Sequence, residues 1–326
     1  LDVSNNTALT DLNCSNNLIT SLDVSQYTAL TVLYCNFNQL TSLDVSNNLA
    51  LTHLHCDDNQ LTNLDVSGAT ALTYLNCFFN QLTNLDVSGA TALTYLRCDD
   101  NQLTNLDVSG ATALTFLNCF FNQLTSLDVS QNLALINFSC GYNLLTSLDV
   151  SNNLALALFH CENNQITSLD VSNGNNLNFV QFNVTNNPNL TCIYVDNPIW
   201  STTNWTNIDA QHFFSTEILP NFTITDVTCA GLSDGTATIS PSGGSGFYTI
   251  NWFNGSSGNT VGPLPAGFWT VTITDDNLCT TTPATLIIEI EMPTPIILSS
   301  SFVDASCFGY CDGSAFSMPS GGTPPY

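Results

Sequence analysis

The sequence predicts a mainly β protein in which a long solenoid, with a parallel sheet and no full helices, precedes a smaller β-sandwich. Two observations predict the solenoid. LDVS begins at residues 1, 22, 43, 64, 85, 106, 127, 148 and 169, and Cys recurs at the same 21-residue interval from Cys14 to Cys161. A fixed period of this length is the signature of stacked repeats. The sandwich is predicted because short alternating strands, such as FTITDV and FYTINWF, replace the repeat from about residue 219.

Each repeat has the pattern LxxLxCxxNxLxxLDVS, as in the unit that starts at Leu72. This pattern resembles the leucine-rich repeat, LxxLxLxxNxL, with Cys in place of the second strand Leu. The resemblance covers residues 1–192 and implies a parallel sheet on the concave face of a right-handed solenoid. The residues agree with it, because Leu75 and Cys77 are two apart and therefore point to one side of a strand. The L and V of LDV also share a side, which predicts a second short extended segment followed by a turn.

Two columns of the repeat are predicted to be structural. The eight repeat cysteines, one in every 21 residues, lack the CxxC-like spacing of metal ligands. We expect them to be inert thiols in the core, where Cys behaves as a small hydrophobic residue. An Asn follows three residues after each of these Cys, from Asn17 to Asn164. Its amide can hydrogen-bond the backbone where the strand turns.

The Asp of LDVS forms a third column, which runs from Asp2 to Asp170. At a rung spacing of about 4.8 Å, two like charges repel by roughly 0.9 kcal/mol even in water. Arg97 is the single basic residue against 26 Asp and Glu, and the formal net charge is −25. Two interpretations remain open: turn-capping hydrogen bonds to each Asp, or cations such as Ca²⁺ bound along the column. The same charge argues against binding to nucleic acids and to anionic membranes.

The residues between the core positions of the strand are predicted to point outward on the concave face. They vary from unit to unit while the core positions repeat, and exposed contiguous aromatics usually mark an interaction surface. The 42-residue alternation of FF and DD also fits duplication of paired units, in which the rings only shield one another. On the same register, Phe179 and Gln181 would continue two of the outward columns. The predicted ligand-binding residues are Tyr74, Phe78, Phe79, Tyr95, Arg97, Asp99, Asp100, Phe116, Phe120, Phe121, Asp57, Asp58, His53 and His55.

One stretch, LTHLHCDDN, has the residue types of a metal site. His53, His55 and Asp57 alternate along one strand, and two imidazoles with a carboxylate suit zinc or another divalent ion. The same alternation also describes ordinary polar surface residues, and we predict neither a metal nor another cofactor. The sequence lacks a nucleophile elbow, HExxH, a P-loop and GxGxxG. We therefore expect a protein that is not an enzyme.

Residues 193–218 are predicted to cap the solenoid. The segments NLTCI, VDNP and NWTNIDA around this region resemble the terminal segment of leucine-rich repeat proteins from Bacteroidetes. A cap is needed because the last rung would otherwise expose its core. We expect Trp200, Trp205, Phe213 and Phe214 to cover that rung. The state of Cys192 stays open.

Residues 219–295 are predicted to form the sandwich, and Cys229 and Cys279 are expected to bridge it. CAGLSDGTATISPSGGSGFY at 229–248 aligns without a gap to CFGYCDGSAFSMPSGGTPPY at 307–326. Residues 296–326 are therefore expected to be the truncated start of a second sandwich. The pattern resembles the SprB-type repeat of Bacteroidetes surface adhesins, which implies an Ig-like fold used in tandem as a stalk, on proteins exported by type IX secretion. Cys311 departs from that pattern, and its state stays open.

These expectations combine into one functional prediction. We expect a non-catalytic, secreted or cell-surface binding protein, whose concave repeat face recognises a protein or glycan and whose Ig-like repeats form a stalk. Two alternatives remain: a structural surface-layer or matrix spacer without a specific ligand, and a cation-dependent polysaccharide-binding module. Because the chain opens inside a repeat and stops inside a module, we expect a fragment. Its signal peptide, sorting domain and further SprB-type repeats would then lie elsewhere.

Overall fold

The computed structural model describes residues 6, 8–244, 247–275 and 284–322. The chain divides into two compact units, residues 1–216 and 217–326. Each unit is described by itself.

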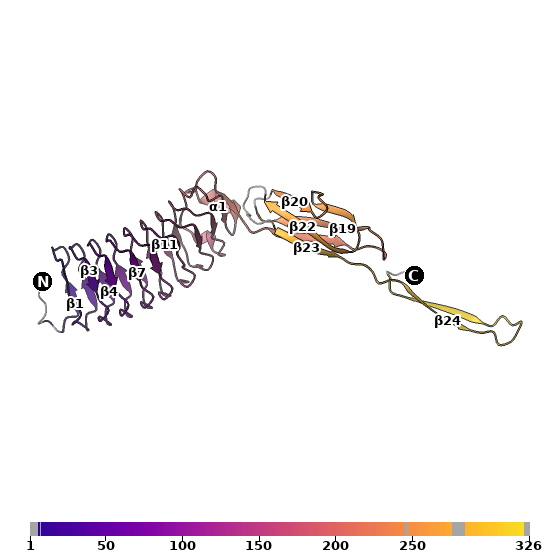
Figure 1. Cartoon of the computed structure of the whole chain (residues 1–326), viewed down its shortest axis with the longest axis horizontal. Coiled ribbons are helices and arrows are strands. Elements are labelled where there is room, and N and C mark those ends of the chain that lie inside the picture. The colour runs from indigo at the N-terminus through magenta and orange to yellow at the C-terminus, as the bar shows by residue number, and fades with distance from the viewer. Residues whose placement is uncertain (1–5, 7, 245–246, 276–283, 323–326) are drawn as a thin grey trace. The chain divides into compact units, whose positions relative to one another are not determined.

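The first unit is built on a nine-stranded parallel sheet (Figure 1). Each strand has three residues, and neighbouring strands pair in register, so that Tyr74 lies opposite Tyr95. This arrangement confirms the predicted parallel-sheet solenoid. The strands, in their order across the sheet, are β1 (Asp11–Asn13), β2 (Val32–Tyr34), β4 (His53–His55), β6 (Tyr74–Asn76), β8 (Tyr95–Arg97), β10 (Phe116–Asn118), β11 (Asn137–Ser139), β13 (Leu158–His160) and β15 (Gln181–Asn183).

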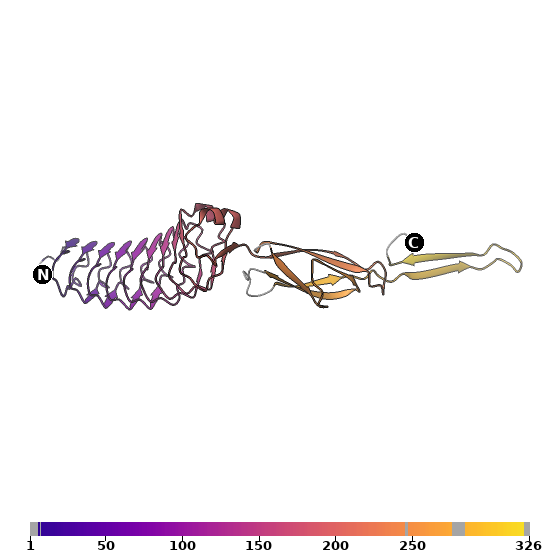
Figure 2. The same ribbon diagram turned by 90° about the horizontal axis from the view of Figure 1, so that it is seen from above.

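The LDV segments form a second row of short strands along the opposite side of the stack (Figure 2). In each of them the Leu is buried and the flanking residues face outward, as predicted. A 21-residue rung leaves no room for a helix between the two rows. The described residues contain one α-helix, α1 (Pro198–Asn204), and one 3-10 turn, η1 (Asn176–Asn178). The strands of this row are β3 (Ser42–Asp44), β5 (Asn63–Asp65), β7 (Asn84–Asp86), β9 (Asn105–Asp107), β12 (Ser147–Asp149), β14 (Ser168–Asp170), β16 (Cys192–Tyr194) and β17 (Phe213–Ser215).

The repeat leucines and thiols form one continuous core between the two rows of strands. Leu75 and Cys77 are completely buried, because residues two apart on a strand share a face. The Cys77 thiol donates to the backbone carbonyl of Arg97 on the next rung at 3.5 Å. Burial raises the pKa of the Cys77 thiol far above its ordinary value, so the thiolate does not form at neutral pH. The expected inert core thiols are confirmed.

The repeat asparagines join each rung to its neighbour. The amide of Asn101 donates to the carbonyls of Cys98 and Cys77, at 3.2 and 3.1 Å, and its oxygen accepts the backbone N–H of Leu82 at 3.0 Å. One side chain therefore satisfies three backbone groups on two rungs, which confirms its predicted role. We call this column the asparagine ladder, and its other members with the same contacts are Asn38, Asn59, Asn80, Asn122, Asn143 and Asn164.

The register changes at the end of the solenoid. Leu158 pairs with Gln181 rather than with Phe179, because the last rung contains two more residues than the others. The predicted outward position of Phe179 is therefore wrong, and that ring lies in the core against Phe159 and Trp205. Gln181 remains on the sheet but is shifted to the first strand position.

The cap closes the core with aromatic rings. Trp205 is buried and stacks on Phe182 at 4.0 Å, and Phe214 is also buried. Trp200 packs against this cluster at its margin. The expectation for Phe213 is wrong, because alternation along β17 turns this ring outward and leaves it 47% exposed.

The second unit contains two three-stranded antiparallel sheets that share one apolar core. This arrangement agrees with the predicted Ig-like sandwich. One sheet has the order β18 (Leu219–Thr225), β19 (Gly235–Ser242) and β21 (Thr260–Leu264), and the other has β20 (Tyr248–Trp252), β22 (Gly267–Asp275) and β23 (Ala284–Ile290). A hairpin of β24 (Ile297–Val303) and β25 (Ser314–Ser320) repeats the pairing of β18 with β19. Asp312 accepts from the backbone N–H of Ser306 as Asp234 accepts from that of Thr228.

Three cysteines outside the ladder bear on the predicted bridges. Cys229 is an exposed, free thiol, which contradicts the expected bridge at that end; Cys279 lies outside the described residues. Cys192 is buried on β16 and is disulfide-bonded. Cys311 is exposed and free.

The asparagine ladder generates a stability prediction. Asn101→Ala leaves the buried N–H of Leu82 and two backbone carbonyls without their side-chain partner, so the free energy of unfolding should fall by about 2–4 kcal/mol. The exposed neighbour Gln102 provides the control, since Gln102→Ala should change it by less than about 0.5 kcal/mol. Urea titration followed by circular dichroism measures both variants. Equal unfolding midpoints for the two would show that the ladder is not a main source of stability.

Candidate functional site

The solvent side of the nine-stranded sheet, which we call the sheet face, carries the first group of predicted residues. On β6, Leu75 points into the core while Tyr74 and Asn76 point to the other side. The same alternation places His53 and His55 of β4, and Tyr95 and Arg97 of β8, on the sheet face. Phe116 of β10 follows Tyr95 in the same column.

The rings of one column form a continuous stack. Tyr74 and Tyr95 have ring centroids 4.3 Å apart at an interplanar angle of 6°, and Tyr95 and Phe116 are 4.3 Å apart at 8°. This geometry follows from the backbone, since adjacent parallel strands lie about 4.8 Å apart and aligned side chains must meet face to face. His55 continues the stack between Tyr74 and Tyr34, at 4.7 and 4.5 Å. The ring faces therefore cover one another, and the ring edges face solvent.

Arg97 neutralises a buried carboxylate on the same rung. Its Nε and Nη2 donate to the two carboxylate oxygens of Asp99, at 2.8 and 3.1 Å. The side chain of Asp99 is only 6% exposed. The guanidinium also lies 3.8 Å from the centre of the Phe78 ring, a cation–π contact. Arg97, the only Lys or Arg in the sequence, is thus fully committed inside the molecule.

Asp57 occupies the same position as Asp99, two rungs earlier, but has no such partner among the described residues. Asn76 donates to its Oδ1 at 3.0 Å, and Nδ1 of His55 lies 4.0 Å from that oxygen. Burial raises the pKa of Asp57 to about 6. Burial also lowers the pKa of His55, with a smaller effect of His53. At neutral pH the pair is therefore a buried carboxylate beside a neutral imidazole.

The His53, His55 and Asp57 group does not form a metal site. Nδ1 of His53 lies 3.0 Å from the hydroxyl of Thr52, and both imidazoles belong to ring contacts with Tyr74. Within the described ranges, no three His, Cys, Asp or Glu side chains are arranged to hold a metal ion.

The second group of predicted residues lies on a different surface. Strand β6 ends at Asn76, and Phe79 lies three residues further on, in the left-handed region at φ 52°. Asp58, Asp100 and Phe121 have the same conformation, so they stand on the turn that leaves the sheet rather than on the sheet face. Phe78 and Phe120 lie half-buried between the two surfaces. We call the turn column the turn ridge, which consists of Phe37, Asp58, Phe79, Asp100, Phe121 and Tyr142.

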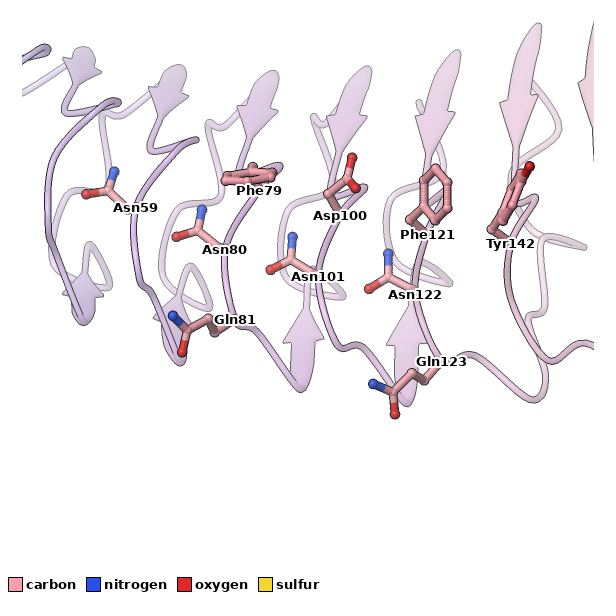
Figure 3. Close-up of a pocket in the computed structure, with 10 residues that line it drawn as sticks. All are labelled: Asn59, Phe79, Asn80, Gln81, Asp100, Asn101, Phe121, Asn122, Gln123 and Tyr142. Atoms are coloured by element: carbon pink, nitrogen blue, oxygen red, sulfur yellow. The ribbon is translucent and has the colours of Figure 1, made fainter. Parts of the chain in front are cut away.

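A groove of about 500 Å³ runs beside the turn ridge (Figure 3). Phe79, Asp100, Phe121 and Tyr142 line one wall, the asparagine ladder from Asn59 to Asn122 lines the base, and Gln81 and Gln123 complete the lining. Tyr142 was not among the predicted site residues, although it follows Phe121 by 21 residues and the two rings lie 4.2 Å apart. Its place in the repeat was the signal that could have identified it.

The LDVS carboxylates cap the turns on the opposite side of the stack. Oδ1 of Asp44 accepts the backbone N–H of Ser46 at 2.9 Å, and the same contact recurs along the column from Asp23 to Asp170. Hydrogen bonds from Ser46 lower the pKa of Asp44. Turn capping, the first of the two interpretations of this column, is therefore confirmed.

The contrast between Asp57 and Asp44 generates a pH prediction. Because the pKa of Asp57 rises from 3.8 to about 6 on folding, the folded state holds this proton more tightly, and stability falls as pH rises through that interval. Asp57→Asn should therefore stabilise the protein at pH 7.5 by up to about 3 kcal/mol, and the gain should vanish near pH 4. Thermal melts at several pH values measure the effect.

Asp44→Asn is the matched control for this prediction. The pKa of Asp44 is lowered on folding, so its ionised form contributes stability that is present at neutral pH and is lost as pH falls. This substitution should not raise the melting temperature at pH 7.5. A melting temperature that is unchanged by Asp57→Asn at every pH would contradict the assigned environment of Asp57.

Comparisons with known proteins agree with this architecture. The family model for leucine-rich repeats, two copies, matches residues 7–48, and the model for the SprB repeat matches residues 221–257. A search of curated proteins finds no match to the chain.

Two solved structures illustrate the similarity. The functional domain of InlJ from Listeria monocytogenes, which includes a cysteine ladder, is 26% identical, with 89% of this chain and 83% of that chain covered and a TM-score of 0.46. A leucine-rich repeat protein of Leptospira interrogans is 21% identical, with 62% and 56% covered and a TM-score of 0.51, which supports the solenoid fold. The chain therefore combines leucine-rich repeats with a SprB repeat.

Proposed function

We propose that this chain is a non-catalytic binding protein whose sheet face recognises a partner protein. One observation carries this proposal: the stack of Tyr74, Tyr95 and Phe116 on the solvent side of the sheet. These rings are half-buried only by one another, since the leucine core lies on the opposite side of the same strands. Aromatic side chains that offer a large rigid area are the usual anchors of protein interfaces.

The geometry of the stack favours a protein over a glycan. A sugar ring stacks on a free aromatic face, whereas both faces of Tyr95 are covered at 4.3 Å by its neighbours. What remains accessible is a row of ring edges and tyrosine hydroxyls, next to the imidazoles of His53 and His55. Such a row suits edge contacts and hydrogen bonds with side chains and backbone of a protein surface.

The rigidity of the sheet supports tight binding. The backbone pairs in register on every rung, and Thr94 N–H donates to the carbonyl of Thr73 just before Tyr95. Ordering of flexible side chains and loops is one of the main costs of association. A surface whose backbone and rings are already fixed avoids most of that cost.

The arrangement gives no support to catalysis. Asp99 is held by Arg97, Asp57 by Asn76, and the ring of His55 is stacked on both sides. A general acid or base must reach a substrate proton with a free, positioned group. These titratable groups of the sheet face are instead engaged within the protein.

We infer a place at the cell surface or outside the cell. The SprB repeat at residues 221–257 supports this assignment, with the sandwich as a spacer, further SprB-type repeats in the full-length protein and export by type IX secretion. The helix found in the described part of the chain is too short to cross a bilayer.

The proposal predicts the effect of removing the rings. Tyr95→Ala combined with Phe116→Ala should weaken binding to extracellular proteins at least tenfold, because anchors at the centre of an interface carry most of its energy. Arrays of extracellular proteins and of glycans, probed with the full chain, identify the ligand, and titration of that ligand measures the loss. Phe253→Ala, which removes a partly exposed ring of the sandwich, is the control and should bind as the unmodified protein does. Binding only to glycans, or equal binding by all three proteins, would refute the proposal.

A further inference from the structure

The turn ridge is built from residues that are poorly suited to its backbone. Phe37, Asp58, Phe79, Asp100, Phe121 and Tyr142 all have φ between 49° and 53°. A residue with a Cβ in this left-handed conformation costs about 1–2 kcal/mol, and Asn and Asp tolerate it better than aromatic residues. The chain itself uses Asn at the same position of other rungs, at Asn16 and Asn163.

Burial does not account for the aromatic residues of the ridge either. Phe79 is 60% exposed, Phe37 48%, Phe121 45% and Tyr142 41%. A strained backbone and an exposed apolar ring are each unfavourable in the isolated protein. Strained positions that carry such rings are typical of binding sites, where a partner supplies the missing contact.

Rings and carboxylates alternate along the ridge in a fixed geometry. Asp58 stands between Phe37 and Phe79, and Asp100 stands between Phe79 and Phe121. Backbone hydrogen bonds continue through the turn, for example from Phe79 N–H to the Asp99 carbonyl at 3.1 Å. The rungs therefore keep their spacing of about 4.8 Å here, and the two carboxylates stand about 10 Å apart.

We propose that the turn ridge and its groove bind an extended basic segment of a partner protein, with Lys or Arg side chains at Asp58 and Asp100 between the rings. Charge complementarity favours this occupant. The net charge is −25, and the only cation of the chain, Arg97, is committed to Asp99. A carboxylate accepts a charge-assisted hydrogen bond, and ring faces beside it add cation–π attraction.

The molecule already contains a small version of this contact. Arg97 places its guanidinium against the Asp99 carboxylate and over the Phe78 ring, on the rungs that carry Phe79 and Asp100. The ridge carboxylates lack a comparable partner, and burial raises the pKa of both Asp58 and Asp100. A cation from outside would complete at the ridge what Arg97 completes beside it.

The spacing specifies the segment further. In a polyproline II chain, residues three apart lie on one face and are separated by about 9.3 Å, close to the distance of two rungs. The exposed amides of Gln81 and Gln123, across the groove from the ridge in Figure 3, are placed to hydrogen-bond the backbone of such a segment. We therefore expect basic residues at every third position.

A peptide titration of the full chain tests the inference. The probe is a fluorescein-labelled peptide of Ala-Pro-Lys repeated four times, followed by fluorescence anisotropy at several salt concentrations. Asp58→Asn with Asp100→Asn, and separately Phe79→Asn with Phe121→Asn, should each weaken binding at least tenfold. The melting temperature of the ring variant should not fall, because Asn is native to this column at Asn16 and Asn163.

Three controls make the result specific. Asp86→Asn with Asp107→Asn removes the same charge on the opposite side of the stack, and Leu133→Asn with Leu154→Asn removes exposed apolar side chains elsewhere. Both should bind the peptide unchanged, as should Tyr95→Ala on the sheet face. A peptide of the same composition with its lysines adjacent should bind at least tenfold more weakly.

The outcomes separate this inference from the sheet-face proposal. Loss of peptide binding in the two ridge variants alone supports the ridge. Equal binding by the ridge variants and the controls, absence of binding by the unmodified chain, or equal binding of the two peptides would overturn it. None of these three results bears on whether Tyr95 and Phe116 bind a protein partner.

Discussion

The asparagine amide that joins one rung to the next is the contact on which the rest of the structure depends. In Asn101 a single side chain satisfies the carbonyls of Cys98 and Cys77 and the N–H of Leu82. The chain can therefore leave the sheet within the core without stranding buried backbone groups, each of which would cost about 1–3 kcal/mol. The same turn holds the preceding residue, Asp100, in the left-handed conformation. Stability and the display of side chains thus arise from one local device, repeated along the stack.

Repetition makes neighbouring rungs the main environment of every outward side chain. Tyr74, Tyr95 and Phe116 stack because the strands that carry them lie about one ring thickness plus a small offset apart. Asp57 and Asp99 have equivalent positions, but the rung of Asp99 carries Arg97 and that of Asp57 carries His55. One cation in the whole chain therefore makes two equal sequence positions electrostatically different. The result is a sheet face with one neutralised carboxylate and one whose ionisation opposes folding.

The strand end divides the outward residues into two surfaces with different chemistry. Alternation continues from Tyr74 through Asn76 to Phe78, and then Phe79 turns away at φ 52°. The sheet face offers covered rings and engaged polar groups. The turn ridge offers freely exposed rings with carboxylates between them. An FF or DD pair therefore contributes one residue near each surface, so a change of the pair alters both surfaces together. This coupling answers why two neighbouring positions vary while the rest of the unit repeats.

The sequence by itself determined the features that depend on local alternation and on the 21-residue period. Leu75 and Cys77 in the core, the structural role of Asn101, the extended LDV segment and the later antiparallel strands were all predictable, because each rung repeats the same local geometry. Only the tertiary structure decided where β6 ends, that Phe78 and Phe79 part there, that two extra residues bury Phe179, and that Phe213 faces solvent. It also decided the different states of Asp57 and Asp99. These outcomes depend on contacts between rungs, about 21 residues apart in the chain, and a pattern within one unit carries no information about them.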